Sequence, residues 1–149
     1  MYDGGGVKVT AFVNDHGPFV VPSYGYKIEY DDHSVVLCGD TRYYAEVVRQ
    51  STGVDVLVHC VTVIPNELLQ KFPAYKAIYE HLASLEDAGR VFAEARPKLA
   101  VHSHIGLNGD ATQYDLVART RKVYDGPLQV GRDLMTIEIT GKPTVSMPK

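Results

Sequence analysis

The first third of the chain shows the alternation of apolar and polar residues that is typical of half-buried β-strands. Residues 7–13 alternate in this way, and residues 14–23 form a turn-rich stretch with two prolines. Two further apolar runs, residues 26–30 and 34–38, are separated by Asp31-Asp32-His33, which indicates a hairpin turn. The pattern predicts three successive strands, and a hairpin joins the last two.

Helical and strand patterns alternate in the middle of the chain. A helix is predicted over residues 44–50, and Gly53 ends it. Residues 55–59 follow as a continuous apolar run, which predicts a buried strand. Residues 67–80 are helical in tendency but are broken by Pro73, because proline removes a helical hydrogen bond and clashes with the preceding turn.

A well-marked helix start follows at Ser84. Ser84 is the predicted N-cap, and Asp87 at the third helical position makes an acidic variant of the capping box. Pro97 stops this helix, and a buried strand begins at Leu99. A helix over residues 114–124 and closing strands over residues 128–130 and 134–139 complete the prediction. Strands that alternate with helices predict an α/β fold.

Length and composition are those of one folded domain. The chain has 149 residues, 45% of them hydrophobic, and a net charge of −3. This charge argues against a general nucleic-acid-binding surface, because phosphate binding relies on clustered Lys and Arg. We interpret Arg119, Arg121 and Lys122 as a solvated helix face rather than an RNA contact. Cys38 and Cys60 lie in apolar strands and are expected to be small core residues, with a disulfide between neighbouring strands as the alternative.

The start of the chain has no signal-peptide character, and no run approaches the roughly 18 apolar residues of a membrane span. We therefore expect no membrane partner. Glycines 4–6 stand directly before an apolar run, which is typical of a loop inside a larger domain. Met1 is accordingly expected to be an internal start or a truncation point.

Candidate chemistry gathers where two predicted strands end. Cys38-Gly39-Asp40-Thr41 closes one apolar run, and His102-Ser103-His104-Ile105 closes another. In α/β proteins, ligand sites lie at the carboxyl ends of the strands. Asp40 is therefore well placed to hold a metal ion or a polar substrate, and His104 is its expected partner. The alternative for Asp40 is a turn residue that caps the following helix.

The order of several segments, taken together, resembles a known family. The segments are Val9-Thr-Ala-Phe, Asp15-His-Gly-Pro, Gly25-Tyr-Lys-Ile-Glu-Tyr, Ser34-Val-Val-Leu-Cys-Gly-Asp-Thr, Val54-Asp-Val-Leu-Val-His, Glu86-Asp-Ala-Gly-Arg and Leu99-Ala-Val-His-Ser-His-Ile. Over roughly residues 7–140 this order is similar to the C-terminal half of the metallo-β-lactamase superfamily, in the branch of ribonuclease Z-like and arylsulfatase-like hydrolases. The resemblance implies half of an αββα sandwich: one mixed sheet with helices on its outer face.

The resemblance also implies roles for individual residues. In the family, the Asp of Gly-Asp-Thr bridges two zinc ions and the His of the last strand binds one of them, and these roles fall on Asp40 and His104. Thr41 and His59 are expected to support these ligands from behind. Because side chains alternate along a strand, His102 and His104 are expected to point to opposite faces, and the family register then places His104 in the site.

Two more histidines have roles by resemblance, each with an alternative. His81 corresponds to a residue that donates a proton to the leaving group, but it stands one position further from Glu86 than the family pattern shows, with Leu82 in the expected place. A surface or helix-end histidine is the alternative. His16 matches a loop that borders the substrate pocket, and the alternative is a turn residue bonded to the backbone.

The chain lacks the His-x-His-x-Asp-His run that the family carries in its N-terminal half. A catalytic zinc is normally held by at least three protein ligands, so Asp40 and His104 are not expected to hold one tightly. Residues 1–149 are thus expected to be the C-terminal part of a hydrolase domain that is inactive alone. Full-length relatives would act on a small-molecule ester, a phosphodiester or a sulfate.

Two hypotheses follow for function and partners. The first is a zinc-dependent hydrolase whose missing half comes from elsewhere. The second is a degenerate, non-catalytic module, or truncated gene product, that acts as an interaction partner. In either case the apolar residues Val35, Val36, Leu37 and 56–58 would leave an exposed patch if the other sheet were absent. That patch predicts a homo-oligomer or the binding of the missing N-terminal half.

Overall fold

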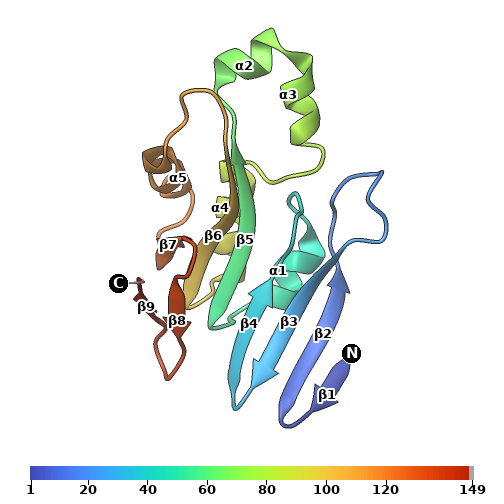
Figure 1. The fold of residues 1–149 in the computed structure, drawn as a ribbon, viewed down its shortest axis with the longest axis vertical. Coiled ribbons are helices and arrows are strands. Elements are labelled where there is room, and N and C mark those ends of the chain that lie inside the picture. The colour runs from blue at the N-terminus through green and yellow to red at the C-terminus, as the bar shows by residue number, and fades with distance from the viewer. Residues whose placement is uncertain (148–149) are drawn as a thin grey trace.

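A mixed seven-stranded sheet is the framework of the molecule, as the computed structural model shows for residues 1–147 (Figure 1). Its strands stand in chain order: β1 (Tyr2–Gly4), β2 (Val7–Val13), β3 (Tyr24–Tyr30), β4 (His33–Leu37), β5 (Val56–Val63), β6 (Leu99–Leu107) and β7 (Leu128–Val130). The pairs from β1 to β4 are antiparallel, and the pairs from β4 to β7 are parallel. The direction changes after β4 because connections without helices join the first four strands, whereas crossovers with helices join β4 to β5, β5 to β6 and β6 to β7.

Helices cover one face of this sheet. The described residues form α1 (Ala45–Ser51), α2 (Asn66–Lys71), α3 (Pro73–Ile78), α4 (Leu85–Ala95) and α5 (Gln113–Thr120). Buried residues of α1, α4 and α5 pack on the sheet, whereas α2 and α3 project beyond one end of β5 (Figure 1). The expected α/β fold, a mixed sheet with helices on its outer face, is confirmed.

Local sequence signals fix several helix ends as predicted. The Ser84 hydroxyl oxygen accepts the Asp87 backbone N–H at 3.1 Å and so caps α4. Pro73 stands at the start of α3 and separates it from α2. The last helix, α5, ends at Thr120 and not at Tyr124, because the chain turns there to bury the Tyr124 ring in the core.

The glycines that we interpreted as a loop of a larger domain form a tight hairpin turn. Gly5 and Gly6 have φ values of 60° and 79°, and Gly4 pairs with Val7 across the turn. Positive φ at both central residues is the geometry of the hairpin turn that glycine favours. The short strand β1, which the alternation pattern did not predict, results from this turn.

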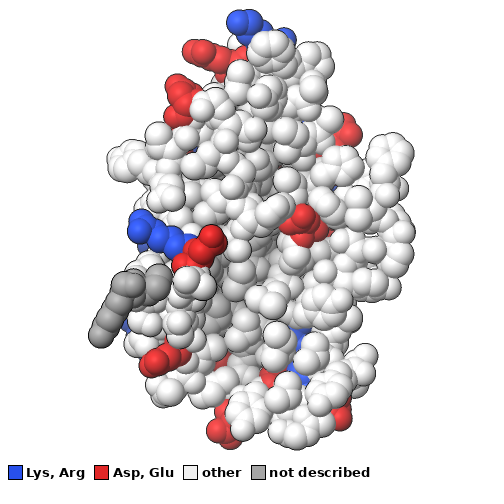
Figure 2. Space-filling model, in the orientation of Figure 1, with Lys and Arg blue, Asp and Glu red and all other residues white. Residues whose placement is uncertain are grey.

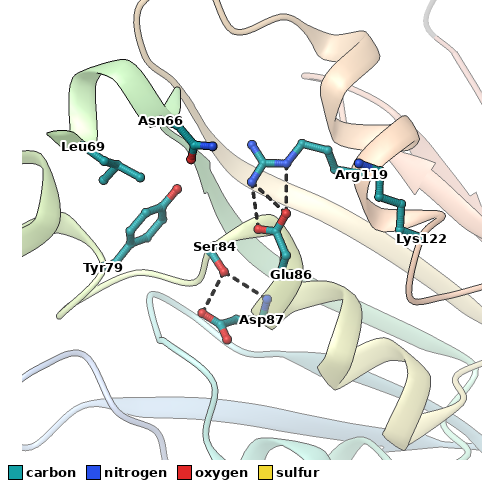
Figure 3. Close-up of a pocket in the computed structure, with 8 residues that line it drawn as sticks. All are labelled: Asn66, Leu69, Tyr79, Ser84, Glu86, Asp87, Arg119 and Lys122. Carbon is teal, nitrogen blue, oxygen red and sulfur yellow. Dashed lines mark hydrogen bonds and ion pairs between the residues drawn. The ribbon is translucent and has the colours of Figure 1, made fainter.

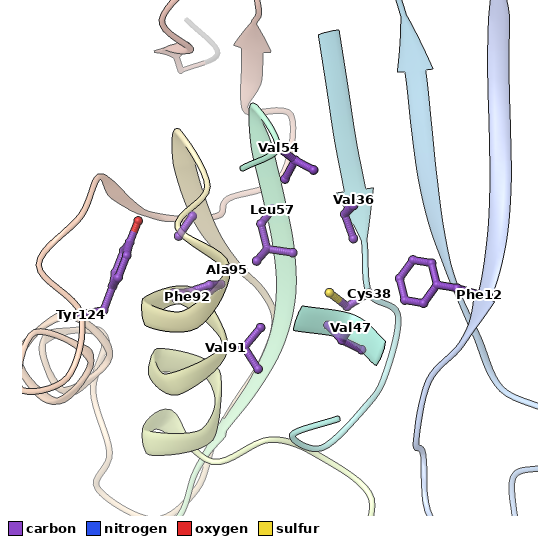
Figure 4. Packing of buried hydrophobic residues seen from close by; sticks show 11 residues of the cluster. Phe12, Val36, Cys38, Val47, Val54, Leu57, Val91, Phe92, Ala95 and Tyr124 are labelled. Atoms are coloured by element: carbon purple, nitrogen blue, oxygen red, sulfur yellow. The ribbon is translucent and has the colours of Figure 1, made fainter. Parts of the chain in front are cut away.

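The main core lies between the sheet and the helices (Figure 4). Leu57 of β5 and Val36 of β4 are neighbours in the parallel register and are fully buried. Phe92 of α4 packs over them together with Val47 of α1. Burying side chains of this size stabilises the fold by about 1.5–3 kcal/mol each. Cys38 is a free thiol in this cluster, so its expected role as a small core residue is confirmed.

The face of the sheet opposite the helices is only partly covered. The predicted closing strand 134–139 does not join the main sheet: its residues Thr136–Glu138 form β8, which pairs with β9 (Thr144–Ser146) as a separate hairpin. This hairpin packs its apolar residues on Val56 and Val101. The expectation about a strand of the main sheet was wrong, because the pairing partner, β9, lies later in the chain and carries little apolar pattern.

The exposed apolar surface is smaller than the sequence suggested and lies over β2, β3 and β4. Alternation turns Val36 and Leu57 toward the helices, so only every second residue faces the open side. Leu37 and its register partner Tyr26 remain 40% and 45% exposed. In the view of Figure 2 the charged side chains lie mostly toward the ends and edges of the molecule, and the surface over β5 and β6 is largely uncharged.

None of the described helices is long and apolar enough to cross a membrane.

Candidate functional site

A tight turn after β4 presents Asp40 at the carboxyl edge of the parallel strands. The backbone N–H of Cys38 bonds to the carbonyl of Val58 at 3.0 Å, which ends the pairing of β4 with β5. Gly39 then adopts a φ of +65°, and a Cβ at this position would lie 3.1 Å from the carbonyl oxygen of Tyr24. Glycine is thus required here by conformation and by space. The turn delivers Asp40 where the sequence predicted it, at the strand's carboxyl end.

Thr41 is fully buried and locks this turn to its neighbours. Its backbone N–H donates to the Cys60 sulfur at 3.3 Å, and the Cys60 thiol donates to the Thr41 carbonyl at 3.1 Å. The Thr41 hydroxyl oxygen also accepts the backbone N–H of Asp15 at 3.1 Å. Burial raises the pKa of the Cys60 thiol, so this sulfur stays a neutral hydrogen-bonding group. The structure therefore places Thr41 directly behind Asp40.

Asn14 is a contributor that the sequence reasoning missed. Its side-chain amide donates to the carbonyls of Cys38 and Asp40 at 2.6 and 3.2 Å, and the residue is only 5% exposed. These bonds tie the loop after β2 to the turn that carries Asp40. The only signal was a polar residue directly after an alternating strand, which is also typical of an ordinary turn.

A β-bulge sets the direction of His104. Cys60 pairs with Ser103 and the next residue of β5, Val61, pairs with Ile105, so His104 is the extra residue. Its φ is +43°, a left-handed conformation that costs free energy outside glycine. In a regular strand, residues two apart share a face, so His102 and His104 would both have been buried or both exposed. The expectation that alternation alone would separate them was wrong: the bulge does so, leaving His102 buried and His104 exposed beside Asp40.

Asp40 lies between two imidazoles. Its Oδ1 is 2.6 Å from Nδ1 of His104, and its Oδ2 is 3.9 Å from Nε2 of His16. Thus three of the predicted site residues, which come from three separate loops or strand ends, are brought together. As they lie, no three His, Cys, Asp or Glu side chains within residues 1–147 are grouped closely enough to hold a metal ion.

The side chains of His16 and His81 each bond to the backbone carbonyl of the other residue, and we call this pair of hydrogen bonds the His16–His81 clasp. Nδ1 of His16 lies 2.9 Å from the carbonyl oxygen of His81, and Nδ1 of His81 lies 2.9 Å from the carbonyl oxygen of His16. The rings meet edge to face with centroids 5.9 Å apart. A carbonyl can only accept, so both Nδ1 atoms carry the proton and both Nε2 atoms are free to act. His81 is thereby joined to the Asp40 group through His16.

His59 and His102 lie on the opposite, helix-covered face, away from Asp40. Nδ1 of His59 donates to the Cys60 carbonyl at 2.7 Å, and its ring meets the Phe92 ring edge to face. Nε2 of His102 lies 2.9 Å from the Thr120 hydroxyl oxygen. Burial, with His59 beside it, lowers the pKa of His102 to about 3, so the imidazole is neutral at ordinary pH. The structure does not bring these two histidines together with Asp40 and His104.

Two hollows meet at the candidate site. One of about 240 Å³ is lined by Asp40 and Cys60, and another of about 490 Å³ by Arg132 and Met135; both include Ser103 and His104 in their walls. Leu37 and Val58, which face away from the helices, also line the smaller hollow, so the site lies on the helix-free face.

A separate hollow of about 650 Å³ lies between α2, α4 and α5 (Figure 3). Arg119 of the predicted basic helix face crosses it and binds both carboxylate oxygens of Glu86 at 2.8 Å. Ser84 and Asp87 in its wall form the N-cap of α4. These polar groups already serve helix packing.

Comparison with known proteins gives the family. No family model matches the chain. It is 30% identical to a ribonuclease Z of Mycobacterium marinum over 93% of this chain and 50% of that protein. The metallo-β-lactamase fold protein YhfI of Bacillus subtilis superposes with a TM-score of 0.70 at 17% identity, over 88% of this chain and 49% of the other. The short form of human tRNase Z superposes with a TM-score of 0.61 at 18% identity, over 91% of this chain and 44% of the other.

Over nearly its whole length the chain is similar to ribonuclease Z proteins, and its fold is that of the metallo-β-lactamase superfamily. This confirms the family that the order of segments implied. The chain spans about half the length of the curated relatives it matches. The fold brings Asp40 and His104, the two residues to which the resemblance gives metal-ligand roles, within 2.6 Å of each other.

Proposed function

We propose that this chain is the C-terminal part of a metal-dependent hydrolase of the ribonuclease Z-like branch. The proposal rests on one observation: the contact of Asp40 with His104 at 2.6 Å at the carboxyl edge of β4 and β6. The name of the relatives, ribonuclease Z, makes a phosphodiester the favoured substrate class. The net charge of −3 implies that most phosphate contacts come from another part of the assembled enzyme.

The side chains at this point fit a zinc centre by their chemistry. A carboxylate and an imidazole nitrogen are both common zinc ligands, and both are accessible from solvent here. A centre with two metal ions needs more ligands than these, so an N-terminal half with the His-x-His-x-Asp-His run would supply them. Alone, the chain is therefore proposed to be inactive.

The chain's own residues would do three things in the assembled centre. Asp40 and His104 would hold the metal, with Thr41 and Asn14 fixing the Asp40 turn against β5 and the loop after β2. His81 would serve as the general acid, because its Nδ1 proton is engaged by the His16 carbonyl and its Nε2 is left to carry a proton to the leaving group. When bound, the metal ions would lower the pKa of a water molecule and so supply the nucleophile.

The proposal is tested by complementation. The purified chain is mixed, in the presence of zinc, with the separately produced N-terminal half of the Mycobacterium marinum ribonuclease Z, and hydrolysis of bis-p-nitrophenyl phosphate is followed. We expect activity only in the mixture, and a loss of at least about 100-fold with Asp40→Ala or His104→Ala, since even residues behind a metal ligand contribute 10–100-fold. His33→Ala, at the other end of the sheet, is the matched control and should be neutral.

A mixture that binds but never hydrolyses the substrate would favour the second candidate, a non-catalytic interaction partner. The observation behind that candidate is the exposed apolar surface around Tyr26 and Leu37. Activity that survives Asp40→Ala would contradict the proposed centre itself.

A further inference from the structure

We propose that the hollow of about 490 Å³ beside His104 is a nucleotide subsite, in which apolar residues take the base and Arg132 binds a phosphate group. The inference rests on the proposed function, because the nucleotide would lie next to the phosphodiester that reacts at Asp40 and His104. It adds the residues of this chain that hold a part of the substrate which does not itself react.

The lining of this hollow has the make-up of a small-molecule site. Such sites are mostly apolar, hold a few polar groups and have volumes of about 300–1,000 Å³. Val101 and Ile105 of β6 line it from the sheet. Met135 and Ile137, at the start of the β8–β9 hairpin, line it as well and pack against the cluster that contains Val101. A flat base bound here would contact both the sheet and the hairpin, and the flexible Met135 thioether makes favourable contacts with aromatic rings.

Backbone contacts with β6 place Arg132 beside the hollow. The Gly131 N–H donates to the His102 carbonyl at 2.8 Å, and a Cβ on Gly131 would lie 2.6 Å from that oxygen. Glycine is therefore needed for the chain to run this close to β6 after it leaves β7 (Figure 1). The Arg132 carbonyl then accepts the Met135 N–H at 3.1 Å and closes a turn. This turn puts Arg132 and Met135 in the wall of one hollow.

The guanidinium of Arg132 is left available for a ligand. Arg132 is exposed and forms no ion pair with a carboxylate within residues 1–147. By contrast, a carboxylate is bound by each of Arg42, Arg90 and Arg119. An arginine without such a partner can donate two parallel hydrogen bonds to a phosphate, and its planar group can also stack on a base. Arg132 therefore supplies the positive charge that a nucleotide requires.

Asp133 makes the hollow selective for a nucleotide over a bare anion. It is the only acidic residue that lines this hollow in the described part of the chain. Its carboxylate repels an isolated phosphate but can accept a hydrogen bond from a base N–H or a sugar hydroxyl. Ser103 lines both this hollow and the one that contains Asp40. A nucleotide bound here would therefore extend from the reacting ester past Ser103 to the hairpin.

Nuclear magnetic resonance titration of the isolated chain with adenosine 5′-monophosphate, and separately with its 3′ isomer, tests the subsite. With at least one isomer we expect the methyl resonances of Ile105 and Met135 to move. Adenosine and inorganic phosphate should each bind at least about 10-fold more weakly, because each lacks part of the contacts. Arg132→Gln should weaken nucleotide binding about 10-fold, leave adenosine binding unchanged and melt like the unmodified protein. Arg49→Gln, which changes an exposed arginine of α1, is the matched control and should alter neither.

The outcomes separate the subsite from the proposed function, because the titration needs neither a metal ion nor the N-terminal half. Millimolar nucleotide that moves no resonance of the hollow would overturn the subsite, even where the mixture of the two halves is active. Equal binding by the unmodified chain and Arg132→Gln would overturn the role of Arg132, and shifts confined to α5 would overturn the location. Binding that depends on Arg132, together with an inactive mixture, would support the nucleotide site and contradict the two-half hydrolase.

Discussion

At the scale of single residues, Gly17 decides whether the clasp between His16 and His81 can form. Its φ is +82°, and a Cβ there would lie 2.3 Å from Nδ1 of His81 and 2.8 Å from the carbonyl oxygen of Glu80. Gly53 has a similar φ of +69° but nothing within 4 Å of its would-be Cβ. Both glycines therefore have a backbone conformation that is strained for other residues. They differ in the space for a Cβ atom, which is blocked at Gly17 by His81 and Glu80 and is open at Gly53.

We predict that Gly17→Ala is more destabilising than Gly53→Ala. Both substitutions carry the strain of a left-handed conformation, about 1–2 kcal/mol, whereas only the first forces His81 away from the His16 carbonyl. Urea denaturation of both variants measures the difference, and the His81 ring resonances should change only in Gly17→Ala. Equal loss of stability with unchanged His81 resonances would mean that the clasp is not rigid.

Thr41→Val is predicted to cost about 1 kcal/mol, because it leaves the partly buried backbone N–H of Asp15 without its acceptor. The free energy of unfolding is the measurement. Thr52→Val is the matched control: Thr52 lies at the surface, and its hydroxyl donates to the Val48 carbonyl one turn earlier in the same helix. If both variants unfold at the same urea concentration, Thr41 is not what ties the Asp40 turn to the loop after β2.

The sequence was sufficient to predict that Asp40 and His104 lie close together, because Asp40 follows an apolar strand, His104 lies toward the end of another, and the family resemblance assigned them to one site. It was not sufficient for Asn14 or for the bulge at His104. Both depend on contacts between segments far apart in the chain, Asn14 with the turn after β4 and β5 with β6, and the local sequence does not indicate such contacts. The same holds for the mutual bonds of His16 and His81, which join residues 65 positions apart.

At the scale of elements, Asp55 holds the start of β5 to the strands on both sides. Its carboxylate accepts the backbone N–H of Ser34 at 2.7 Å and the Lys98 ammonium at 2.7 Å, and the residue is 2% exposed. Burial by itself would raise the pKa of this carboxyl, but the hydrogen bonds from Lys98 and Ser34 outweigh burial and lower it. Folding therefore favours the ionised form.

The carboxyl of Asp55 has a lower pKa in the folded protein than in the unfolded chain, where it is about 3.9. Its ionised form therefore stabilises the fold at pH values above about 3.9, and this contribution is lost as the pH falls through the pKa of the folded state. We therefore predict that Asp55→Asn destabilises the protein by about 2 kcal/mol at pH 7 and by progressively less below about pH 4. Urea midpoints measured from pH 3 to pH 7 test this. Asp110→Asn, at an exposed position, should give a difference near zero throughout; a constant deficit for Asp55→Asn at every pH would contradict the linkage.

Elements with local signals were predicted well, and elements defined by distant pairing were not. The cap at Ser84 and the break at Pro73 depend only on residues close by in the sequence, so α3 and α4 begin where expected. The hairpin of β8 and β9 is different, because its strands are short and pair with each other rather than with the main sheet. A three-residue strand carries too little alternation to reveal its partner.

At the scale of the whole molecule, the two faces of the sheet differ in a way that bears on assembly. The outer face is closed by α1, α4 and α5, whereas the inner face is covered by the β8–β9 hairpin only over the later strands. The open part adjoins the turn that carries Asp40, because Leu37 lines the same hollow as Asp40. A partner that covers this face would therefore also approach the candidate metal site.

We predict that the isolated chain associates through this open face in a concentration-dependent way. Replacing Tyr26 and Leu37 by threonine keeps strand propensity but removes two large apolar side chains, each worth about 1.5–3 kcal/mol when buried, so the association should weaken by at least about 10-fold. Sedimentation velocity over a range of concentrations is the measurement. Tyr114→Thr, on the exposed surface of α5, is the control and should not change it. If the double variant instead associates like the unmodified chain, the contact lies elsewhere; if it also fails to be activated by the N-terminal half, one surface serves both the self-association and the completion of the enzyme.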